Sequence, residues 1–473
     1  MIKGKNRAVN DLRDAIALAE ENNELVRIKK PVNVELELAG EYLKYAGGVP
    51  IPPPTKIGPV VLFENVFRLI NSQKIQYKIP VIAGVLGSRE RVAQYLGVNR
   101  ENLSLKMLEA IENPMPLRYV SDAPCQEVVI DKNINLLEQL PIPVLSYDCA
   151  GPSITMGLMR ALDPETGHGD VTFHRIIVVG PDTLTAFMSP IRHIKQMQLK
   201  AEKKNKPFPV SINIGLDPFT AISAGLSPPT GTDIDELTVA GALKGSPIEV
   251  VKCKTIDCEA IANAEIVIEA EVQPNVMLME DLITKKGWTI PEMAGYMGRA
   301  VPAQVLKVKA ITHREDAIYQ TLINPGEEHN IIAGIPGEAE ITNAIWRAGY
   351  KDLLKNIYLP PAGGGKLMCV IQVKKRDSGD DMEVRNIAMI ALATRLEIRC
   401  AIIVDEDVEI YDPMDLWWAL TTRFNAKEGL VILDQIKSWP GLAEYVRDNK
   451  MILDCTLPWS EKEKYFRPRF KRG

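Results

Sequence analysis

Apolar positions recur every three to four residues in segment 9–21, and this spacing predicts an amphipathic helix near the start of the chain. Two extended apolar runs, at 59–64 and 80–86, predict strands, and Ser88 is placed to cap a following helix. We therefore expect a small α/β unit that ends near the proline-containing stretch 112–119.

Strands dominate the middle of the chain. Its extended runs occupy residues 126–131, 174–179, 208–214, 248–252, 264–272 and 303–311. Helical spacing interrupts them near 190–203 and near 233–243. Because the strands are short and the helices are few, this part predicts a β-barrel or sandwich better than a doubly wound sheet.

Helices and strands alternate after about residue 320. The expected elements are helices at 338–348, 381–394 and 413–424 and strands at 367–374, 400–404 and 429–433. That order predicts a parallel sheet with crossover helices. The chain as a whole is therefore expected to be an α/β (α+β) protein.

Length, charge and cysteine content narrow the class of protein. A chain of 473 residues is longer than one hydrophobic core usually supports, so two or three domains are expected. The net charge of -5 and the pI near 5.8 disfavour a nucleic-acid partner, which normally meets a basic face. Without a signal-like start or a long apolar run, we expect a cytoplasmic protein that does not span the membrane. The 7 cysteines form no C-x-x-C pair and are expected to be reduced thiols.

The common local signatures of nucleotide and zinc sites are absent, since the sequence has no G-x-G-x-x-G, Walker loop or H-E-x-x-H. No two of the 5 histidines lie four residues apart. A metal site can still be assembled over distance, with His193 as the nitrogen ligand and carboxylates from other elements as oxygen ligands. The alternative, that His193 is an ordinary residue on a helix surface, stays open at this point.

Two segments carry candidate acid, base and guanidinium groups. In the first, a glycine-containing turn and Asp170 precede a predicted strand that carries Arg175. In the second, Glu280 and Glu292 stand on either side of a loop. Two carboxylates near one buried arginine suit proton transfer, because the arginine lowers the pKa of one carboxyl while burial raises that of the other. Taken singly, both segments also fit solvent-exposed loops.

Several pieces of the sequence carry a family resemblance by their order and spacing. They are Ile154-Thr155, the DPETG turn at 163–167, Asp170 five residues before Arg175, His193 eighteen after it, DELTVAGALKG (235–245), EVVKC (249–253), AEIVIEAEV (264–272), PEMAGYMG (291–298) and IIVDEDVEIYD (402–412). In these pieces the sequence resembles the UbiD-type decarboxylases, which use prenylated flavin mononucleotide (FMN). The resemblance runs in register over most of the chain and is densest between Ser153 and Gly298.

The resemblance implies three domains and an assembly. These are an N-terminal α/β domain (1–118), a split β-barrel domain that binds the flavin (119–318) and a C-terminal α/β domain used for oligomerisation (319–473). A homo-oligomer, either a dimer or a hexamer, is implied, as is a flavin prenyltransferase that supplies the cofactor.

The resemblance also implies a metal site beside the cofactor phosphate. In the family a divalent ion, Mn²⁺ or Mg²⁺, joins this phosphate to the protein, with K⁺ nearby. By register the ligands fall on Asp170, His193 and Glu236. Asp170 departs from the family, which has an asparagine there, and adds negative charge beside a phosphate. The cofactor contacts implied by register are Thr155, Arg175, Ser227, Pro228, Lys252 and Arg399.

The family's catalytic set, one arginine and two glutamates, falls on Arg175, Glu280 and Glu292. Family members usually keep the glutamates five residues apart, whereas here they are twelve apart. The implied reaction is reversible non-oxidative decarboxylation, or carboxylation, of an aromatic, heteroaromatic or α,β-unsaturated carboxylic acid, with CO₂ as the second small molecule. In this scheme Glu292 protonates carbon, Arg175 orients the substrate and balances charge, and Glu280 supports Arg175.

Two other interpretations stay open. The long glutamate spacing and Asp170 favour a non-catalytic scaffold subunit of a multi-subunit aromatic carboxylase. An ordinary flavin reductase on the same barrel is disfavoured, because the arginine and the glutamates would then have no role. Residues 281–291 are expected to shape the pocket wall, with Trp288 either stacked on an aromatic substrate or packed within the loop.

Overall fold

The computed structural model describes residues 9–46, 57–190, 192–226, 234–436 and 449–468. The chain divides into two compact units, Met1–Ile332 and Ala333–Gly473, and each unit is described by itself. The predicted domain boundaries after residues 118 and 318 stay predictions.

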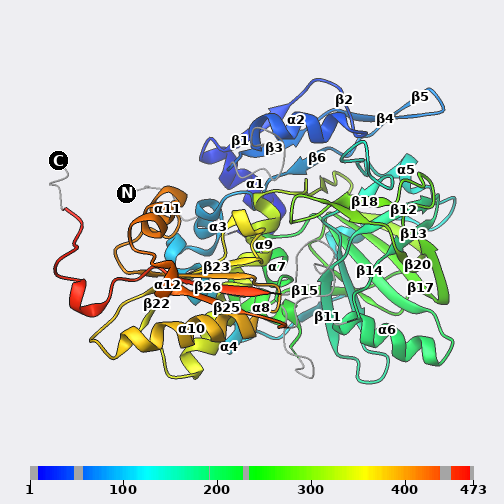
Figure 1. The fold of residues 1–473 in the computed structure, drawn as a ribbon. Helices are drawn as coiled ribbons and strands as arrows, with labels where there is room; N and C mark the ends of the chain where they lie inside the picture. Colours follow the sequence, from blue (N-terminus) through cyan, green and yellow to red (C-terminus); the bar gives the residue numbers. More distant parts are fainter. Residues whose placement is uncertain (1–8, 47–56, 191, 227–233, 437–448, 469–473) are drawn as a thin grey trace. The chain divides into compact units, whose positions relative to one another are not determined.

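The N-terminal part of the first unit is a small α/β layer (Figure 1). Its helices are α1 (Leu12–Glu21), α2 (Glu37–Ala46), α3 (Arg89–Leu96) and α4 (Leu103–Glu112). One sheet of this part has the described order β1 (Leu25–Ile28), β3 (Val60–Phe63), β6 (Val81–Ala83) and β21 (Tyr319–Gln320), and a second has β2 (Val32–Asn33), β4 (Val66–Ile70) and β5 (Gln73–Gln76). The predicted cap is confirmed, because Ser88 Oγ accepts a hydrogen bond from the N–H of Arg91 at 3.3 Å.

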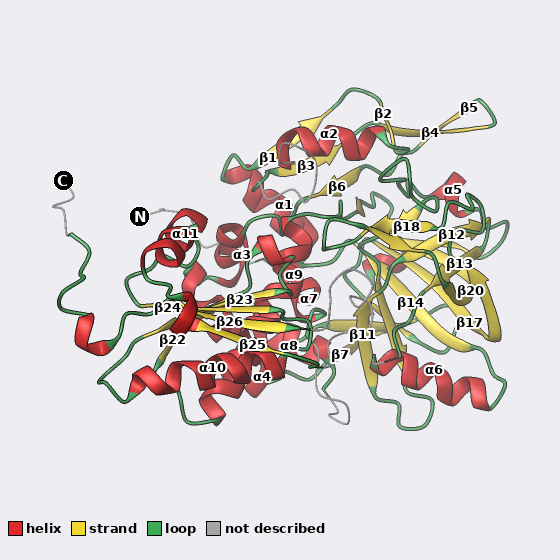
Figure 2. Cartoon of the chain, in the orientation of Figure 1, coloured by secondary structure: helices red, strands yellow, loops and turns green. Residues whose placement is uncertain are grey.

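The centre of the first unit is an antiparallel sheet that curls into a half-barrel, with nine strands among the described residues (Figure 2). Its order is β11 (Gly169–Phe173), β10 (Leu158–Leu162), β14 (Phe208–Ile214), β17 (Ile266–Met279), β20 (Pro302–His313), β13 (Thr183–Ala186), β12 (Ile176–Gly180) and β9 (Ser153–Ile154), with β8 (Val128–Ile130) paired to β20. Apolar side chains such as Ile212 and Ile268 are fully buried between this sheet and its neighbours. The prediction of a barrel over a doubly wound sheet is confirmed.

Shorter elements attach to the half-barrel. The helices are α6 (His193–Lys203), α7 (Pro218–Ser223) and α8 (Glu236–Lys244). The strands are β15 (Glu249–Lys252), β16 (Glu259–Ile261) and β7 (Arg118–Val120) in one small sheet, and β18 (Trp288–Pro291) and β19 (Met297–Arg299) in a hairpin. Strand β18 occupies residues 288–291 of the segment that the sequence predicted as a loop between the two glutamates, and its partner β19 follows Glu292.

The second unit contains a five-stranded sheet in the portion that is described. The order is β22 (Leu354–Tyr358), β23 (Met368–Val373), β24 (Cys400–Asp405), β26 (Lys450–Asp454) and β25 (Leu430–Leu433), with helices α10 (Asp380–Thr394) and α11 (Pro413–Thr422) between strands. The central strands β23, β24 and β26 are parallel, as expected. The expectation that strand 429–433 is also parallel was wrong, because β25 pairs antiparallel with β26 as an edge strand.

Helix α9 (Glu327–Arg347) is longer than the helix predicted at 338–348. Pro336 lies inside it, and the sequence favoured a start beyond this proline because proline lacks the N–H donor of a helix interior. In the structure one missing hydrogen bond does not end the helix. None of the helices in the described ranges has the length and apolarity to cross a membrane. All 7 cysteines are free thiols and buried.

Candidate active site and metal site

Arg175 lies in the link between β11 and β12, one residue before β12 begins. The prediction that it sits inside a strand was wrong for a topological reason. The strands β11 and β12 stand near opposite ends of the sheet order, so the chain must leave the sheet between them. The Arg175 side chain is only 17% exposed, which excludes the alternative of a solvent-facing arginine.

Glu280 follows the last residue of β17 and is completely buried. Its two carboxylate oxygens accept hydrogen bonds from Nε and Nη2 of Arg175 at 2.6 and 2.7 Å, a bidentate pair. The backbone N–H of Val301, next to β20, donates to Glu280 Oε2 at 3.1 Å. The Glu280 carboxylate is therefore held both by the Arg175 guanidinium and by the backbone of Val301.

Glu292 follows β18 and reaches the same guanidinium, because Arg175 Nη1 donates to its Oε1 at 2.8 Å. The hairpin explains how glutamates twelve residues apart meet one arginine. Its strands β18 and β19 fold back on each other, and the tight turn closes with the N–H of Glu292 donating to the carbonyl of Tyr296 at 2.8 Å. The side chain of Glu292 is 34% exposed and has one bond to Arg175, so it is freer to move than Glu280.

The charges in this cluster are coupled. Burial lowers the pKa of Arg175, but the hydrogen bonds and the charges of Glu280 and Glu292 outweigh this effect and raise the pKa, so the guanidinium stays charged. Burial raises the pKa of Glu280, and the hydrogen bonds from Arg175 oppose that rise. We call Arg175, Glu280 and Glu292 the arginine cluster.

Two residues at the arginine cluster were not predicted from the sequence. The ring of Phe187, just after β13, lies 5.3 Å from Cζ of Arg175, within cation–π range. A Cβ on Gly298 would lie 2.8 Å from Glu292 Oε1, so a larger residue at this position would collide with the Glu292 carboxylate. Both contacts arise from the pairing of consecutive strands, β12 with β13 and β18 with β19, and neither pairing was predicted from the sequence.

The three predicted metal ligands come from three elements of the first unit. Asp170 lies in the edge strand β11, His193 begins α6, and Glu236 begins α8. His193 Nδ1 lies 3.6 Å from Asp170 Oδ1, which is an ion-pair distance. Glu236 Oε2 accepts a hydrogen bond from the N–H of Val171 at 3.4 Å, on the residue after Asp170.

Asp170 and Glu236 are both buried. The pKa of Glu236 is raised well above its ordinary value, mainly by burial and secondly by the charge of Asp170. A cation would relieve this repulsion, and two carboxylates with an imidazole form a suitable donor set for a divalent ion. Among the described residues, however, no three such side chains already surround one point. The chemistry of the set therefore fits a divalent ion, while a closed coordination shell is not formed.

The other predicted cofactor contacts differ in their positions. The hydroxyl of Thr155 is held by the protein, since it donates to the carbonyl of Leu322 at 2.8 Å and accepts from the N–H of Leu322 at 3.1 Å. Lys252 is exposed and lies 3.8 Å from Asp257. Arg399 belongs to the second unit, where it is buried just before β24. Ser227 and Pro228 lie outside the described residues.

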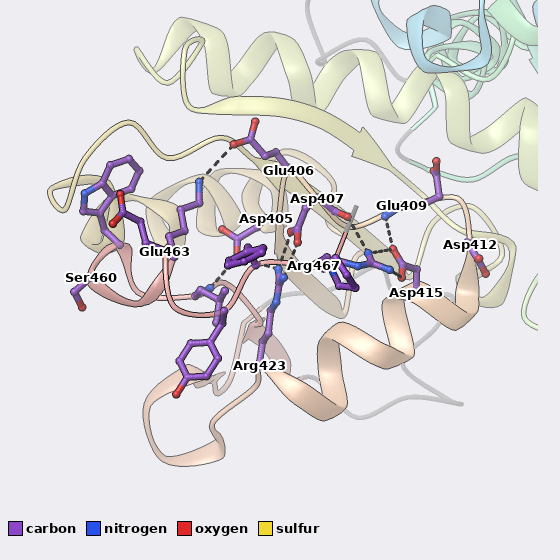
Figure 3. Close-up of a pocket in the computed structure, with 16 residues that line it drawn as sticks. Asp405, Glu406, Asp407, Glu409, Asp412, Asp415, Arg423, Ser460, Glu463 and Arg467 are labelled. Carbon is purple, nitrogen blue, oxygen red and sulfur yellow. Dashed lines mark hydrogen bonds and ion pairs between the residues drawn. The ribbon is translucent and has the colours of Figure 1, made fainter. Parts of the chain in front are cut away.

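A separate hollow of about 1070 Å³ lies in the second unit (Figure 3). Carboxylates dominate its lining, and cations of the same chain pair with some of them. Arg423 pairs with Asp407 at 2.7 Å, and Arg467, in the C-terminal segment, pairs with Asp415 at 2.8 Å. The Arg467–Asp415 pair anchors the C-terminal segment 457–468 along the hollow. We therefore assign the hollow a structural role and place the candidate chemistry at the arginine cluster.

Family comparisons match nearly the whole chain. The three domains of one family, described as the N-terminal, Rift-related and C-terminal domains of 3-octaprenyl-4-hydroxybenzoate carboxy-lyase (UbiD), match residues 16–111, 118–327 and 330–455. Among curated relatives, gallate decarboxylase of Lactiplantibacillus plantarum is 35% identical over 461 residues, which cover 93% of this chain and 92% of the relative.

Comparison with solved structures also gives matches over nearly the whole chain. The apo 3,4-dihydroxybenzoic acid decarboxylase of Enterobacter cloacae superposes with a TM-score of 0.91 at 39% identity, covering 99% of this chain and 98% of the other. An evolved dimeric form of the UbiD-class enzyme HmfF of Pelotomaculum thermopropionicum, solved in complex with prenylated FMN, has a TM-score of 0.83 at 31% identity, and the match covers 97% of both chains.

Proposed function

This chain belongs to the UbiD family and is a carboxy-lyase of that type, and we propose that it decarboxylates an aromatic carboxylic acid, using prenylated FMN and the arginine cluster. The reaction is non-oxidative, so the carboxylate leaves as CO₂ and a proton takes its place on carbon. The reverse carboxylation uses the same steps when CO₂ is abundant.

One observation carries the assignment of the catalytic residues. Arg175 holds one buried glutamate through two bonds and one partly exposed glutamate through a single bond. Decarboxylation needs a cation to orient a carboxylate and an acid to protonate carbon, and this cluster offers both. The scaffold interpretation rested on the long glutamate spacing and on Asp170. The first feature no longer favours it, because both glutamates reach Arg175 despite their spacing.

The chain also offers features that fit a bound cofactor. His174, next to Arg175, is a neutral imidazole, because burial lowers its pKa to about 3. Its Nε2 is buried and has no hydrogen-bond partner among the described residues, as expected beside a site for a polar ligand. We propose that Asp170, His193 and Glu236 hold a divalent ion, Mn²⁺ or Mg²⁺, at the cofactor phosphate. We also propose that K⁺, Thr155, Ser227, Pro228, Lys252 and Arg399 contribute to the cofactor site.

When bound, prenylated FMN supplies the electron sink for the carbanion left at an sp² carbon, which side chains cannot stabilise. Arg175 orients the substrate. A guanidinium has five N–H donors, and four of them are used in bonds to Glu280, Glu292 and the carbonyl of Arg299. We propose that the fifth, on Nη1, binds the substrate carboxylate beside Glu292.

Glu292 is the proposed proton donor. A substrate carboxylate at Nη1 competes with Glu292 for the guanidinium, so substrate binding is expected to release the Glu292 carboxyl from its single bond to Arg175. After CO₂ departs, Glu292 gives its proton to the carbon that carried the carboxylate and takes another from solvent. Glu280 keeps Arg175 in place throughout, since it is buried and bound twice.

The named activities of the relatives suggest a hydroxybenzoic acid as the substrate. The gallate and 3,4-dihydroxybenzoic acid decarboxylases both match over more than nine-tenths of this chain. Trp288 in β18 is 38% exposed and borders the hairpin that carries Glu292, where an aromatic ring can stack on it. We propose a dihydroxybenzoic or trihydroxybenzoic acid, with Trp288 as one wall of its site.

The proposal includes a cellular setting. We propose a homo-oligomer, a dimer or a hexamer, that acts in the cytoplasm and receives its cofactor from a flavin prenyltransferase. Seven free, buried thiols suit a reducing compartment. The three-domain division at residues 118 and 318 is part of the same proposal.

The test is to produce the chain with and without a flavin prenyltransferase. The mass of the extracted flavin and the turnover of gallic, 3,4-dihydroxybenzoic, 4-hydroxybenzoic and cinnamic acids are then measured. We expect prenylated FMN and decarboxylation only after co-production, with the dihydroxylated or trihydroxylated acid preferred. Failure to retain prenylated FMN, or equal turnover with unmodified FMN, would overturn the proposal.

A further inference from the structure

A buried ion triad lies beside the proposed metal site. Arg160, in β10, is 1% exposed and donates from Nη1 to Asp235 Oδ2 at 2.7 Å and from Nη2 to Glu259 Oε2 at 2.9 Å. The guanidinium thus joins strand β10 to two segments that are distant in the sequence. Its charge is matched inside the protein, where ion pairs are little screened.

Asp235 ties this triad to helix α8. It is the N-cap of α8, and its Oδ1 accepts a hydrogen bond from the N–H of Leu237 at 3.0 Å. One carboxylate therefore binds the helix end with one oxygen and Arg160 with the other. The next residue, Glu236, is a proposed metal ligand, so Arg160 holds the helical turn that carries this ligand.

The triad also meets edge strand β11, which carries Asp170. Arg160 stands directly opposite Val171 in the pairing of β10 with β11. The N–H of Val171 donates to Glu236 Oε2 at 3.4 Å. Helix α8 is thus fastened to two neighbouring strands, to β10 by Asp235 through Arg160 and to β11 by Glu236 directly.

Gly169, the residue before Asp170, has no side chain and so leaves room for the guanidinium of Arg160. A Cβ on Gly169 would lie 2.2 Å from Nη2 and 2.4 Å from Cζ of Arg160. No side chain fits there unless the guanidinium moves. The backbone just before Asp170 and the guanidinium of Arg160 are therefore in close contact, and the sequence pair Gly169-Asp170 is explained by this contact.

We propose that Arg160 is a positioning residue that holds α8 against β11, so that Asp170 and Glu236 face each other ready for a divalent cation. The inference rests on the metal site in the proposed function. Two buried carboxylates are unfavourable to bring together before a cation is present, so the elements that carry them must be held by other contacts. The Arg160–Asp235 pair is such a contact at the start of α8, and it leaves less rearrangement to be done when the ion binds.

The test measures Mn²⁺ binding by the full-length protein that carries prenylated FMN. The protein is stripped with a chelator and titrated with Mn²⁺, and free Mn²⁺ is read from its electron paramagnetic resonance signal. The variants are Arg160→Lys, whose single ammonium cannot hold both carboxylates, and Gly169→Ala, which displaces the guanidinium. The matched control is Gly40→Ala in α2, where a Cβ meets nothing within 4 Å.

We expect Arg160→Lys and Gly169→Ala to weaken Mn²⁺ binding by about 10- to 100-fold, the range typical of residues that orient metal ligands, and Gly40→Ala to bind normally. Circular dichroism identifies variants that fail to fold. For that case Glu259→Gln, at the less buried end of the triad, removes the negative charge of one partner of Arg160 and is expected to weaken binding in a folded protein.

Wild-type affinity in any folded triad variant would overturn the inference, because a merely structural triad alters stability and leaves the metal affinity unchanged. If wild-type protein binds no Mn²⁺, the metal site and the role of Arg160 fail together. If the affinities follow the expected order but no acid is decarboxylated, only the proposed reaction fails. The binding and turnover measurements therefore separate the two proposals.

Discussion

Replacing each glutamate of the arginine cluster by its isosteric amide separates the two proposed roles. Glu280 is completely buried and accepts two bonds from Arg175 and one from Val301. In Glu280→Gln the amide has one acceptor oxygen, and its NH₂ group faces donors. At least one charge-assisted hydrogen bond is lost, each worth about 1.5–3 kcal/mol, and a buried guanidinium loses its main counter-charge. We expect the free energy of unfolding to fall by about 2–4 kcal/mol.

Glu292→Gln is the matched variant. This side chain is 34% exposed and has one bond to Arg175, so its loss is expected to cost less than about 1 kcal/mol. As the proposed proton donor, however, it contributes to the rate, and its removal is expected to slow decarboxylation by about 10²- to 10⁴-fold. Glu280→Gln should lower both stability and turnover.

The assay combines denaturant unfolding, followed by circular dichroism, with decarboxylation rates for protein that carries prenylated FMN. The informative quantity is the difference between the two amide variants. If Glu280→Gln unfolds like wild type, or if Glu292→Gln is destabilised as strongly as Glu280→Gln, then the division into a supporting and a proton-donating glutamate is wrong.

Three further predictions concern other parts of the first unit. Thr155→Val leaves the buried N–H and carbonyl of Leu322 without their partner, so the unfolding free energy should fall by about 1–3 kcal/mol in denaturant titrations, and an unchanged value would show that the bonds are dispensable. Burial, and less strongly the charge of Glu90, raises the pKa of Glu327 to about 8 in the folded protein. The same carboxyl ionises at lower pH in the unfolded chain, so its contribution to the free energy of unfolding is lost as the pH rises from about 5 to 8. Glu327→Gln should therefore gain stability relative to wild type by up to about 1.4 kcal/mol per pH unit in that window, and a difference independent of pH would contradict the assignment. Asp170→Asn removes one negative charge from the proposed metal site, so a chelator should strip Mn²⁺ from it faster than from wild type, as followed by metal analysis, and equal loss rates would count against Asp170 as a ligand.

Most of the secondary structure followed from local pattern. Short apolar runs predicted five strands of the half-barrel, and Ser88 predicted the start of α3, because these signals lie within a few residues of the elements that they define. The predicted strands are β8, β12, β14, β17 and β20, whereas β9, β10, β11 and β13 were not predicted. The errors arose where distant contacts decide the outcome. β25 is antiparallel because of its pairing with β26, and α9 continues through Pro336.

The candidate site, too, depends on contacts between residues that are distant in the sequence. Glu280 and Glu292 lie 105 and 117 residues from Arg175 in the sequence, so no local pattern could place them together. The resemblance in register selected these residues, and the geometry shows how the hairpin brings both to one guanidinium. Arg160 was not selected from the sequence, because its importance depends on the pairing of β10 with β11 and on the end of α8.

The central claim is that Arg175 directs CO₂ transfer to and from an aromatic acid. The most direct measurement is exchange of ¹³C-labelled CO₂ into 3,4-dihydroxybenzoic acid by protein that carries prenylated FMN. Wild type is compared with Arg175→Lys and with Arg27→Lys, an exposed arginine that also pairs with two glutamates. We predict exchange in wild type and in Arg27→Lys, and a loss of at least about 10²-fold in folded Arg175→Lys, because lysine cannot replace the bidentate guanidinium. Undiminished exchange in Arg175→Lys would contradict the account.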